Sequence, residues 1–169
     1  MDKKISFIGL GAMGGPMATN IIKKGIELFV YDIDENKKNK VVKEGGLTSK
    51  NILDAVKDSD IVITMLPATE QVKTVLLGEN GVINNLKKDS LILDMSTISP
   101  KGTDEIAKKC KENELNFIDA PVGRLVSHAI AGESLFMVGC DDEKDFERVN
   151  PFLMQWAQAL FDAEKLEQE

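Results

Sequence analysis

The sequence has few of the residues that build disulfide frameworks, metal centres or nucleic-acid surfaces. It contains 2 cysteines and 1 histidine in 169 residues. Cys110 and Cys140 lie far apart in unlike contexts, so we expect neither a disulfide nor a metal site and take both cysteines to be structural. Acidic residues outnumber basic ones by 28 to 21, for a net charge of −7. That excess disfavours nucleic acid or an anionic membrane as partner, because both require a concentrated basic surface.

Long apolar runs are also missing. No stretch approaches the roughly 18 to 20 apolar residues of a membrane span, and residues 1–4 lead directly into a short apolar segment, without the pattern of a secretory signal. The cytoplasm is therefore the expected compartment. Hydrophobic residues make up 43% and charged residues 29% of the chain, which is typical of one globular domain that binds a small molecule.

Short apolar runs rich in β-branched residues alternate with helical patterns. We interpret the runs as buried strands; they are Ile5–Ile8, Leu28–Tyr31, Ile61–Met65, Leu91–Asp94 and Phe117–Ile118. Apolar residues at helical spacing lie between them, as in 13–22 and in 106–110 after the start signal Ser99-Pro100. This order predicts an α/β fold of the doubly wound Rossmann type, with a mostly parallel sheet covered by helices on both faces.

The later part of the chain gives weaker signals. Ser134–Val138 is a further strand candidate, and helical spacing follows from Phe146 to Trp156. Pro151 lies inside that pattern, where we expect it to break or kink the helix. The Lys-rich stretch Asn36–Lys40 is interpreted as the solvated face of a helix.

Gly9, Gly11 and Gly14 form a G-x-G-x-x-G pattern directly after the first strand and at the start of the first helix. In the dinucleotide-binding fingerprint the first glycine permits the tight turn. The second lets the backbone approach a pyrophosphate, and the third allows close packing of the helix. The free N–H groups and the positive dipole end of that helix would then face the anion. A glycine-rich turn without a ligand is the alternative.

Asp32 follows the second strand, about 20 residues beyond the glycines, where the fingerprint places the carboxylate that binds the adenine-ribose hydroxyls. Such a carboxylate repels a 2′-phosphate, and no arginine lies near it, although Lys37 and Lys38 follow. We therefore expect NAD rather than NADP as the cofactor. The alternative is that Asp32 only opens the next turn or caps its helix.

Four segments together carry a family resemblance. They are FIGLGAMGGPMATN (7–20), TMLP (64–67), DMSTISP (94–100) and DAPVGRLVSHAIAGES (119–134). With them the chain, from residue 3 to about residue 155, resembles the NAD-binding domain of the β-hydroxyacid dehydrogenases. This group includes 3-hydroxyisobutyrate dehydrogenases and tartronate semialdehyde reductases and is related to 6-phosphogluconate dehydrogenase. The resemblance implies reversible reduction of a small anionic aldehyde, with NADH as hydride donor.

The resemblance also assigns residues to the cofactor and the substrate. Ser96 is expected near the nicotinamide and the substrate oxygen, and Thr97 beside the cofactor. The other expected cofactor contacts are Gly9, Leu10, Gly11, Ala12, Met13, Gly14, Asp32, Met65, Leu66 and Pro67. Alternatives stay open, because Ser96 and Thr97 could cap the helix near Pro100, and Met65 and Leu66 could be core residues.

The substrate loop departs from the usual family pattern. Gly123, Arg124 and Leu125 stand where relatives carry Ser-Gly-Gly, and this Pro-Val-Gly-Arg variant is similar to the sulfolactaldehyde reductases of the family. A guanidinium offers a planar fork of charged donors to an anionic head group, so Gly123 and Arg124 are predicted to bind substrate. An exposed arginine paired with a surface acid is the alternative. His128 is not used for catalysis in the family, and we expect it to be a solvated loop residue.

Relatives continue with an all-helical second domain whose first helix carries a catalytic lysine and an asparagine, and no lysine of this chain matches that position. We therefore expect a dinucleotide-binding domain over residues 1–163, a short tail over 164–169, and no catalytic residue or metal ligand in the 169 residues. Three functions remain open. The chain is the cofactor domain of an oxidoreductase and inactive alone, a stand-alone NAD-binding module, or a subunit completed by a separate helical chain. A homo-oligomer is compatible with each.

Overall fold

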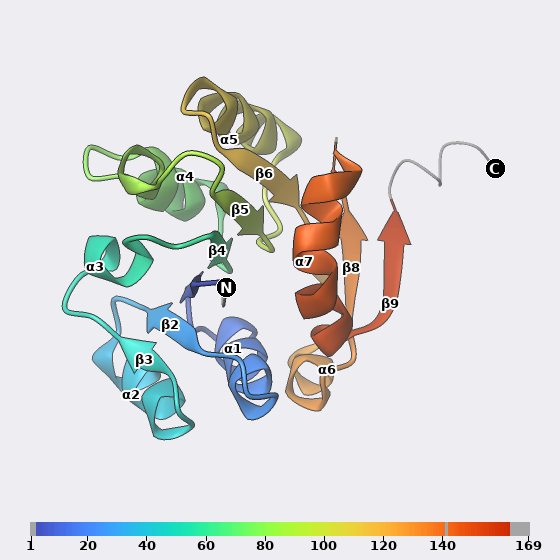
Figure 1. The fold of residues 1–169 in the computed structure, drawn as a ribbon. Coiled ribbons are helices and arrows are strands. Elements are labelled where there is room, and N and C mark those ends of the chain that lie inside the picture. The colour runs from blue at the N-terminus through green and yellow to red at the C-terminus, as the bar shows by residue number, and fades with distance from the viewer. Residues whose placement is uncertain (1–2, 141, 163–169) are drawn as a thin grey trace.

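A computed structural model describes residues 3–140 and 142–162. Six strands form one parallel sheet in the spatial order β3-β2-β1-β4-β5-β6 (Figure 1). They are β1 (Ile5–Ile8), β2 (Leu28–Tyr31), β3 (Leu47–Thr48), β4 (Ile61–Thr64), β5 (Leu91–Asp94) and β6 (Asn116–Asp119). This confirms the predicted doubly wound α/β fold. Of these six strands the sequence pattern missed β3, because two exposed residues are too short a segment to show a buried-strand pattern.

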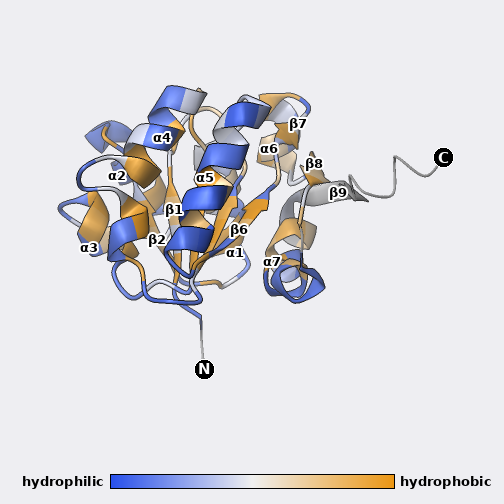
Figure 2. Cartoon of the chain, turned by 90° about the horizontal axis from the view of Figure 1, so that it is seen from above, coloured by the Kyte–Doolittle hydropathy of each residue, from blue (hydrophilic) through white to orange (hydrophobic). Residues whose placement is uncertain are grey.

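Helices cover both faces of this sheet. Those along the chain are α1 (Gly14–Lys23), α2 (Glu35–Lys43), α3 (Ile52–Val56), α4 (Thr69–Leu77), α5 (Pro100–Glu112), α6 (Val126–Ala131) and α7 (Glu143–Trp156), with a 3-10 turn at Val82–Asn85. The apolar sides of α1, α2 and α7 pack in one core cluster, and those of α3, α4 and α5 in another. Figure 2 shows the hydrophobic strands lying between helices whose outer faces are hydrophilic. The sheet is therefore buried on both sides, as its continuous apolar strands predict.

A small second sheet lies beside β6. Strand β8 (Ser134–Val138) pairs antiparallel with β7 (Val122–Gly123) and parallel with β9 (Ala157–Asp162). A bridge between Asp119 and Gly139 joins the two sheets. The sequence predicted β8 but neither of its neighbours. This sheet places the 119–125 loop next to the carboxyl end of the main sheet.

Helix α7 attaches the small sheet to the rest of the molecule (Figure 1). Trp156, at its end, is fully buried, packs edge-on against Phe7, and donates from Nε1 to the Met17 carbonyl oxygen at 2.8 Å. Pro151 lies inside this helix without ending it, so of the predicted break or kink the break is wrong and the kink stays a prediction. Burial of Val149, Leu153 and Trp156 on either side of Pro151 offsets the lost backbone hydrogen bond, which costs about 3 kcal/mol.

None of the described helices has the length and apolarity needed to cross a membrane. The tail expected over residues 164–169 lies outside the described residues, and the domain boundary at residue 163 stays a prediction.

Candidate dinucleotide-binding cleft

The turn after β1 requires glycine at its first position. Gly9 has φ +96°, and a Cβ atom there would lie 2.2 Å from the Met65 carbonyl oxygen. The Gly9 N–H donates to the Tyr31 carbonyl oxygen at 2.9 Å, which ties the turn to the end of β2. Any side chain at this position would push the first turn away from the β4–α4 segment.

The other two glycines have different surroundings. A Cβ atom at Gly14 would lie 2.0 Å from the Gly9 carbonyl oxygen, so the start of α1 touches the preceding turn directly. A Cβ atom at Gly11 would meet nothing within 4 Å, which leaves open space above the loop. Met13, the N-cap residue of α1, makes no side-chain capping bond. The Gly15 N–H donates to the Gly11 carbonyl oxygen, so it is the positive dipole end of α1 beside open space that fits the pyrophosphate of a dinucleotide.

Asp32 supports this loop from the end of β2. One carboxylate oxygen accepts from the Leu10 N–H at 2.7 Å and the other from the Asp34 N–H at 2.8 Å. Helix α2 is capped by Asp34, whose carboxylate accepts from the Asn36 N–H. The helix-capping alternative for Asp32 is therefore wrong. Asp32 holds the 9–14 loop, which we call the phosphate loop, and the β2–α2 turn in place. Each of its oxygens keeps a second lone pair that could accept from a ligand hydroxyl.

Two adjoining cavities form one elongated cleft along this edge of the sheet. A cavity of about 300 Å³ lies over the loop and is lined by Gly9, Gly11, Ala12, Met13, Gly14, Asp32, Lys37, Met65, Leu66 and Pro67. The neighbouring cavity, of about 460 Å³, shares Gly9, Asp32, Lys37, Leu66 and Pro67 with it. The structure thus brings together nine of the predicted cofactor residues. Leu10 is almost fully buried behind the loop and supports it.

The second cavity adds residues that the sequence pattern did not single out. They are Ile8, Tyr31, Ile33, Ile52, Gln71, Thr74 and Val75. The Ile33 side chain is 93% exposed, although it is large and apolar. Its position next to Asp32 was the one available signal, since an apolar residue beside the ribose carboxylate can cover a flat ring. This half of the cleft is mostly apolar with a few polar groups, as small-molecule sites commonly are.

Two lysines of the predicted solvated stretch differ from each other. Lys37 lines both cavities of the cleft. Lys38 is only 4% exposed, pairs with Glu35 at 2.6 Å, and lies 5.0 Å from the centre of the Tyr31 ring. The solvated-face interpretation is therefore wrong for Lys38. Its ammonium lies over the Tyr31 ring at the end of β2 and pairs with Glu35.

Ser96 lies beside the cleft wall. It is fully buried, and its Oγ accepts from the Leu66 N–H at 2.9 Å. Helix α5 is capped by Ser99, which accepts from the Gly102 N–H at 3.2 Å, so the capping alternative for Ser96 is wrong. Thr97 is exposed. Met65 and Leu66 each pack against a core cluster and also line the cleft. Their positions therefore fit both interpretations, as core residues and as cofactor contacts.

Two carboxyl groups end the neighbouring strands β5 and β6. Asp94 and Asp119 are paired in register, and Asp94 is fully buried. Burial raises the pKa of Asp94, while hydrogen bonds from Ser96 and Thr64 act against that rise. Burial and the charge of Asp94 raise the pKa of Asp119 to about 6. The carboxyl edge of the sheet thus holds two acids that resist simultaneous ionisation.

The loop with the predicted substrate residues follows β6. Gly123 is half-buried in β7, and Arg124 is exposed with φ +73°, a conformation that favours glycine. The Arg124 guanidinium donates to the Glu133 carbonyl oxygen at 3.1 Å. His128 is half-buried, and its Nδ1 accepts from the Leu125 N–H at 3.4 Å, so it caps α6. The structure places this loop beside Met95, because the Val122 N–H donates to the Met95 carbonyl oxygen.

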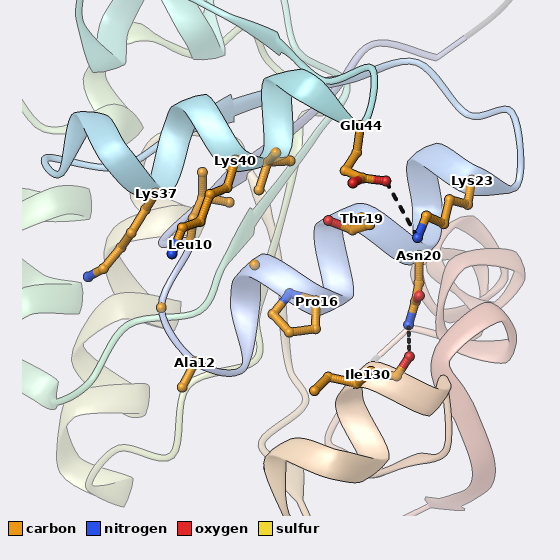
Figure 3. Close-up of a pocket in the computed structure, with 13 residues that line it drawn as sticks. Leu10, Ala12, Pro16, Thr19, Asn20, Lys23, Lys37, Lys40, Glu44 and Ile130 are labelled. Atoms are coloured by element: carbon orange, nitrogen blue, oxygen red, sulfur yellow. Dashed lines mark hydrogen bonds and ion pairs between the residues drawn. The ribbon is translucent and has the colours of Figure 1, made fainter.

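A wider groove lies behind the phosphate loop, between α1, α2 and α6 (Figure 3). Asn20 crosses its end and donates to the Ala129 and Ile130 carbonyl oxygens at 2.9 and 3.4 Å. Lys23 and Glu44 form an ion pair at its rim, 3.4 Å apart. This groove shares Leu10, Gly11, Ala12 and Lys37 with the loop region but contains neither Asp32 nor the 65–67 wall. Its lining overlaps that of the cleft at Gly11, Ala12 and Lys37, and the rest comes mainly from α1, α2 and α6.

The cysteines agree with their predicted structural role. Cys110 is buried in the second core, and burial raises its pKa to about 12. Cys140 is half-buried and contacts the Asp142 carbonyl oxygen. Among the described residues, no group of three or more potential metal ligands comes together.

A parallel six-stranded sheet with a glycine turn, a helix N-terminus beside open space and a carboxylate at the end of the second strand defines a Rossmann-type dinucleotide-binding domain. Residues 4–163 match the family described as the NAD binding domain of 6-phosphogluconate dehydrogenase. The chain belongs to this family, within the β-hydroxyacid dehydrogenase group, and NAD is its cofactor.

Several known proteins are similar to this chain. The 3-sulfolactaldehyde reductase of Escherichia coli is 40% identical over 159 residues, which are 94% of this chain and 53% of that protein. The probable mitochondrial 3-hydroxyisobutyrate dehydrogenase of Dictyostelium discoideum is 38% identical, over 90% of this chain and 47% of that protein. The Mycobacterium tuberculosis 3-hydroxyisobutyrate dehydrogenase, solved with L-serine, superposes with a TM-score of 0.88 at 31% identity, over 95% and 54% of the two chains. The chain thus spans about half the length of the curated relatives it matches.

Proposed function

We propose that this chain is the cofactor domain of an oxidoreductase that reversibly reduces a small anionic aldehyde to a hydroxy acid or a hydroxysulfonate. One observation carries the proposal. The 9–14 loop, Asp32 and the 65–67 wall line one cleft, in which Gly9 and Gly14 leave no room for side chains and Gly11 leaves open space above the loop. Similarity to a sulfolactaldehyde reductase and to hydroxyisobutyrate dehydrogenases supports the substrate class.

The adenosine end favours NAD over NADP. The free lone pairs of Asp32 would accept hydrogen bonds from both ribose hydroxyls, and its charge would oppose a 2′-phosphate. Lys37 lines the same cavities and offers the opposite charge. Asp32 decides the preference, because its two backbone hydrogen bonds fix it in place while Lys37 sits on a flexible stem.

The substrate end is assigned to the two loops that follow β5 and β6. Bound NADH supplies a hydride to the carbonyl carbon. Ser96 would face the nicotinamide and the substrate oxygen, and Gly123 would leave room for the anionic head group. Arg124 would bind that head group once its guanidinium turns from the Glu133 carbonyl oxygen. The exposure of Arg124 and the glycine-like φ of its backbone support this role, since strained loop residues often serve binding.

Calorimetric titration of the 169-residue chain with NADH and NADPH tests the cofactor assignment. We expect NADH to bind at least about tenfold more tightly, which corresponds to about 1.4 kcal/mol. Asp32→Ala should remove that preference. Asp34→Ala, which removes only the cap of α2, should lower stability and leave the preference unchanged. Equal or tighter binding of NADPH to the wild-type chain would remove Asp32 from its role.

The 169 residues assayed alone should bind NADH without turning over sulfolactaldehyde, succinic semialdehyde or tartronate semialdehyde. Charge that develops on the substrate oxygen needs a positioned proton donor, worth about 10² to 10⁴ in rate, and no lysine here matches the family's donor. Turnover near one per second, typical of many enzymes, would contradict this proposal. Activity gained on adding a separately expressed helical half would favour a two-chain enzyme, and NADH binding with no activity under any complementation would favour a stand-alone module.

A further inference from the structure

Asp94 is a buried carboxylate that the proposed cofactor contacts leave unexplained. Its Oδ1 accepts from the Thr64 hydroxyl at 2.8 Å and from the Ser96 N–H at 3.1 Å. Its Oδ2 is buried and has no hydrogen-bond partner among the described residues. Burying a carboxylate costs free energy unless the group is paired and hydrogen-bonded, and within the described part of the chain one oxygen of Asp94 is not. A core position at the end of β5 could be filled by an apolar residue at lower cost.

The hydrogen bonds of Asp94 lead to the cleft. Asp94 fixes the backbone of Ser96, and the Ser96 Oγ accepts from the Leu66 N–H at 2.9 Å. Leu66 lines both cavities of the cleft, and its Cδ2 would lie 2.9 Å from a Cβ atom added at Gly9. A continuous chain of hydrogen bonds therefore runs from the end of β5 to the wall that faces the phosphate loop.

We infer that Asp94 is a positioning residue for the cofactor: through Ser96 it holds the Met65–Pro67 wall at the distance from Gly9 that the dinucleotide requires. The inference rests on the proposed binding of NAD(H) in this cleft. Thr64, the other donor to Asp94, orients the carboxylate from β4. The raised pKa of Asp94 agrees with a group that is kept for its hydrogen bonds at the expense of its solvation.

Hydrogen exchange tests the first half of the inference without any cofactor. In Asp94→Ala the Leu66 amide should exchange at least about tenfold faster relative to the Met65 amide, which bonds to the Ile8 carbonyl oxygen and does not depend on Ser96. Asp94→Asn keeps the Oδ1 acceptor and should restore the wild-type ratio. Ser90→Ala is the matched control, because it removes a buried hydrogen bond to the Ser59 carbonyl oxygen at the other end of β5. An unchanged ratio in Asp94→Ala would overturn the inference.

NADH affinity tests the second half. Asp94→Ala and Ser96→Ala should each weaken binding about tenfold, and the double variant should show about the same loss as either single variant, because both act through one chain of contacts. Asp94→Asn and Ser90→Ala should bind like the wild type. Losses that multiply to about a hundredfold, or an equal loss in Ser90→Ala, would show that Asp94 contributes only to stability. A wild-type chain that fails to bind NADH would instead contradict the proposed function, and the exchange ratio would still decide the hydrogen-bond chain.

Discussion

The cleft that we propose for the cofactor and the loop that we propose for the substrate, here called the cofactor side and the substrate side, are built in different ways. On the cofactor side the unusual backbone is carried by glycine, as at Gly9, and the loop is fixed by backbone hydrogen bonds to Tyr31 and Asp32. On the substrate side a left-handed backbone position is carried by Arg124, and nearby Leu125 and Ile130 are 71% and 62% exposed. The first region is lined by the ends of parallel strands and by the helices that follow them. The second depends on side chains of short elements that present apolar surface to solvent.

This difference predicts that the cofactor side is sensitive even to the addition of a single methyl group at one of its glycines. Gly14→Ala places a Cβ atom 2.0 Å from a backbone oxygen, which cannot move without shifting β1 or α1. We expect a loss of at least about 3 kcal/mol in the free energy of unfolding, at or beyond the upper end for overpacked sites, together with loss of NADH binding. Urea denaturation and calorimetry measure the two effects.

Gly11→Ala is the matched control for that variant, because its Cβ atom meets nothing within 4 Å. Its stability should stay within about 0.5 kcal/mol of the wild type, while NADH affinity falls because the methyl group enters the space left for the pyrophosphate. Equal destabilisation of both variants would contradict the distinct roles given to the two glycines.

The substrate side should show its largest effect in substrate affinity. In a chimera that adds the helical half of a relative, Arg124→Gln should weaken binding of an anionic aldehyde by about ten- to a hundredfold, since a hydrogen bond to a charged group contributes about 1.5 to 3 kcal/mol. NADH affinity should not change. Steady-state kinetics on sulfonated and carboxylated aldehydes measure this effect. An unchanged Michaelis constant for all of these substrates would contradict the proposed role of Arg124.

The two sides also differ in how far the sequence could predict them. Gly9, Gly11, Gly14 and Asp32 were predictable, because one local spacing fixes both their backbone geometry and their chemistry. Gln71 was not, since it reaches the cleft only through packing of α4 against the end of the sheet, and Ile33 was missed although it directly follows Asp32. Strands β7 and β9 were missed for a similar reason. β7 is short, β9 lies at an edge of the small sheet, and both form by pairing with β8 rather than from a local sequence pattern. Pro151 was misjudged because burial around it outweighs its local preference.

Asp119, at the end of β6, should make the free energy of unfolding depend on pH. Its pKa is raised from 3.8 to about 6, so the fold favours the protonated acid. That contribution is complete below about pH 3.8 and is lost as the pH rises through 6. Asp119→Asn should therefore raise the free energy of unfolding by about 1 to 2 kcal/mol at pH 8, after discounting the shift for partial exposure. Below pH 4 the gain should vanish. Asp104→Asn, on the exposed face of α5, serves as control, and a gain in Asp119→Asn that is independent of pH would contradict the argument.

The smallest expected effect isolates the backbone cost at Arg124. A residue with a Cβ atom at φ +73° pays roughly 1 kcal/mol relative to glycine. Arg124→Ala and Arg124→Gly both remove the hydrogen bond to the Glu133 carbonyl oxygen, so the difference between the two variants reports the backbone term alone. We expect Arg124→Gly to be more stable than Arg124→Ala by about 1 kcal/mol in urea denaturation, although glycine also increases the entropy of the unfolded chain. Equal stability would mean that the loop relaxes around alanine. In that case the substrate side would be a flexible surface loop, and the contrast with the glycine-built cofactor side would lose its physical basis.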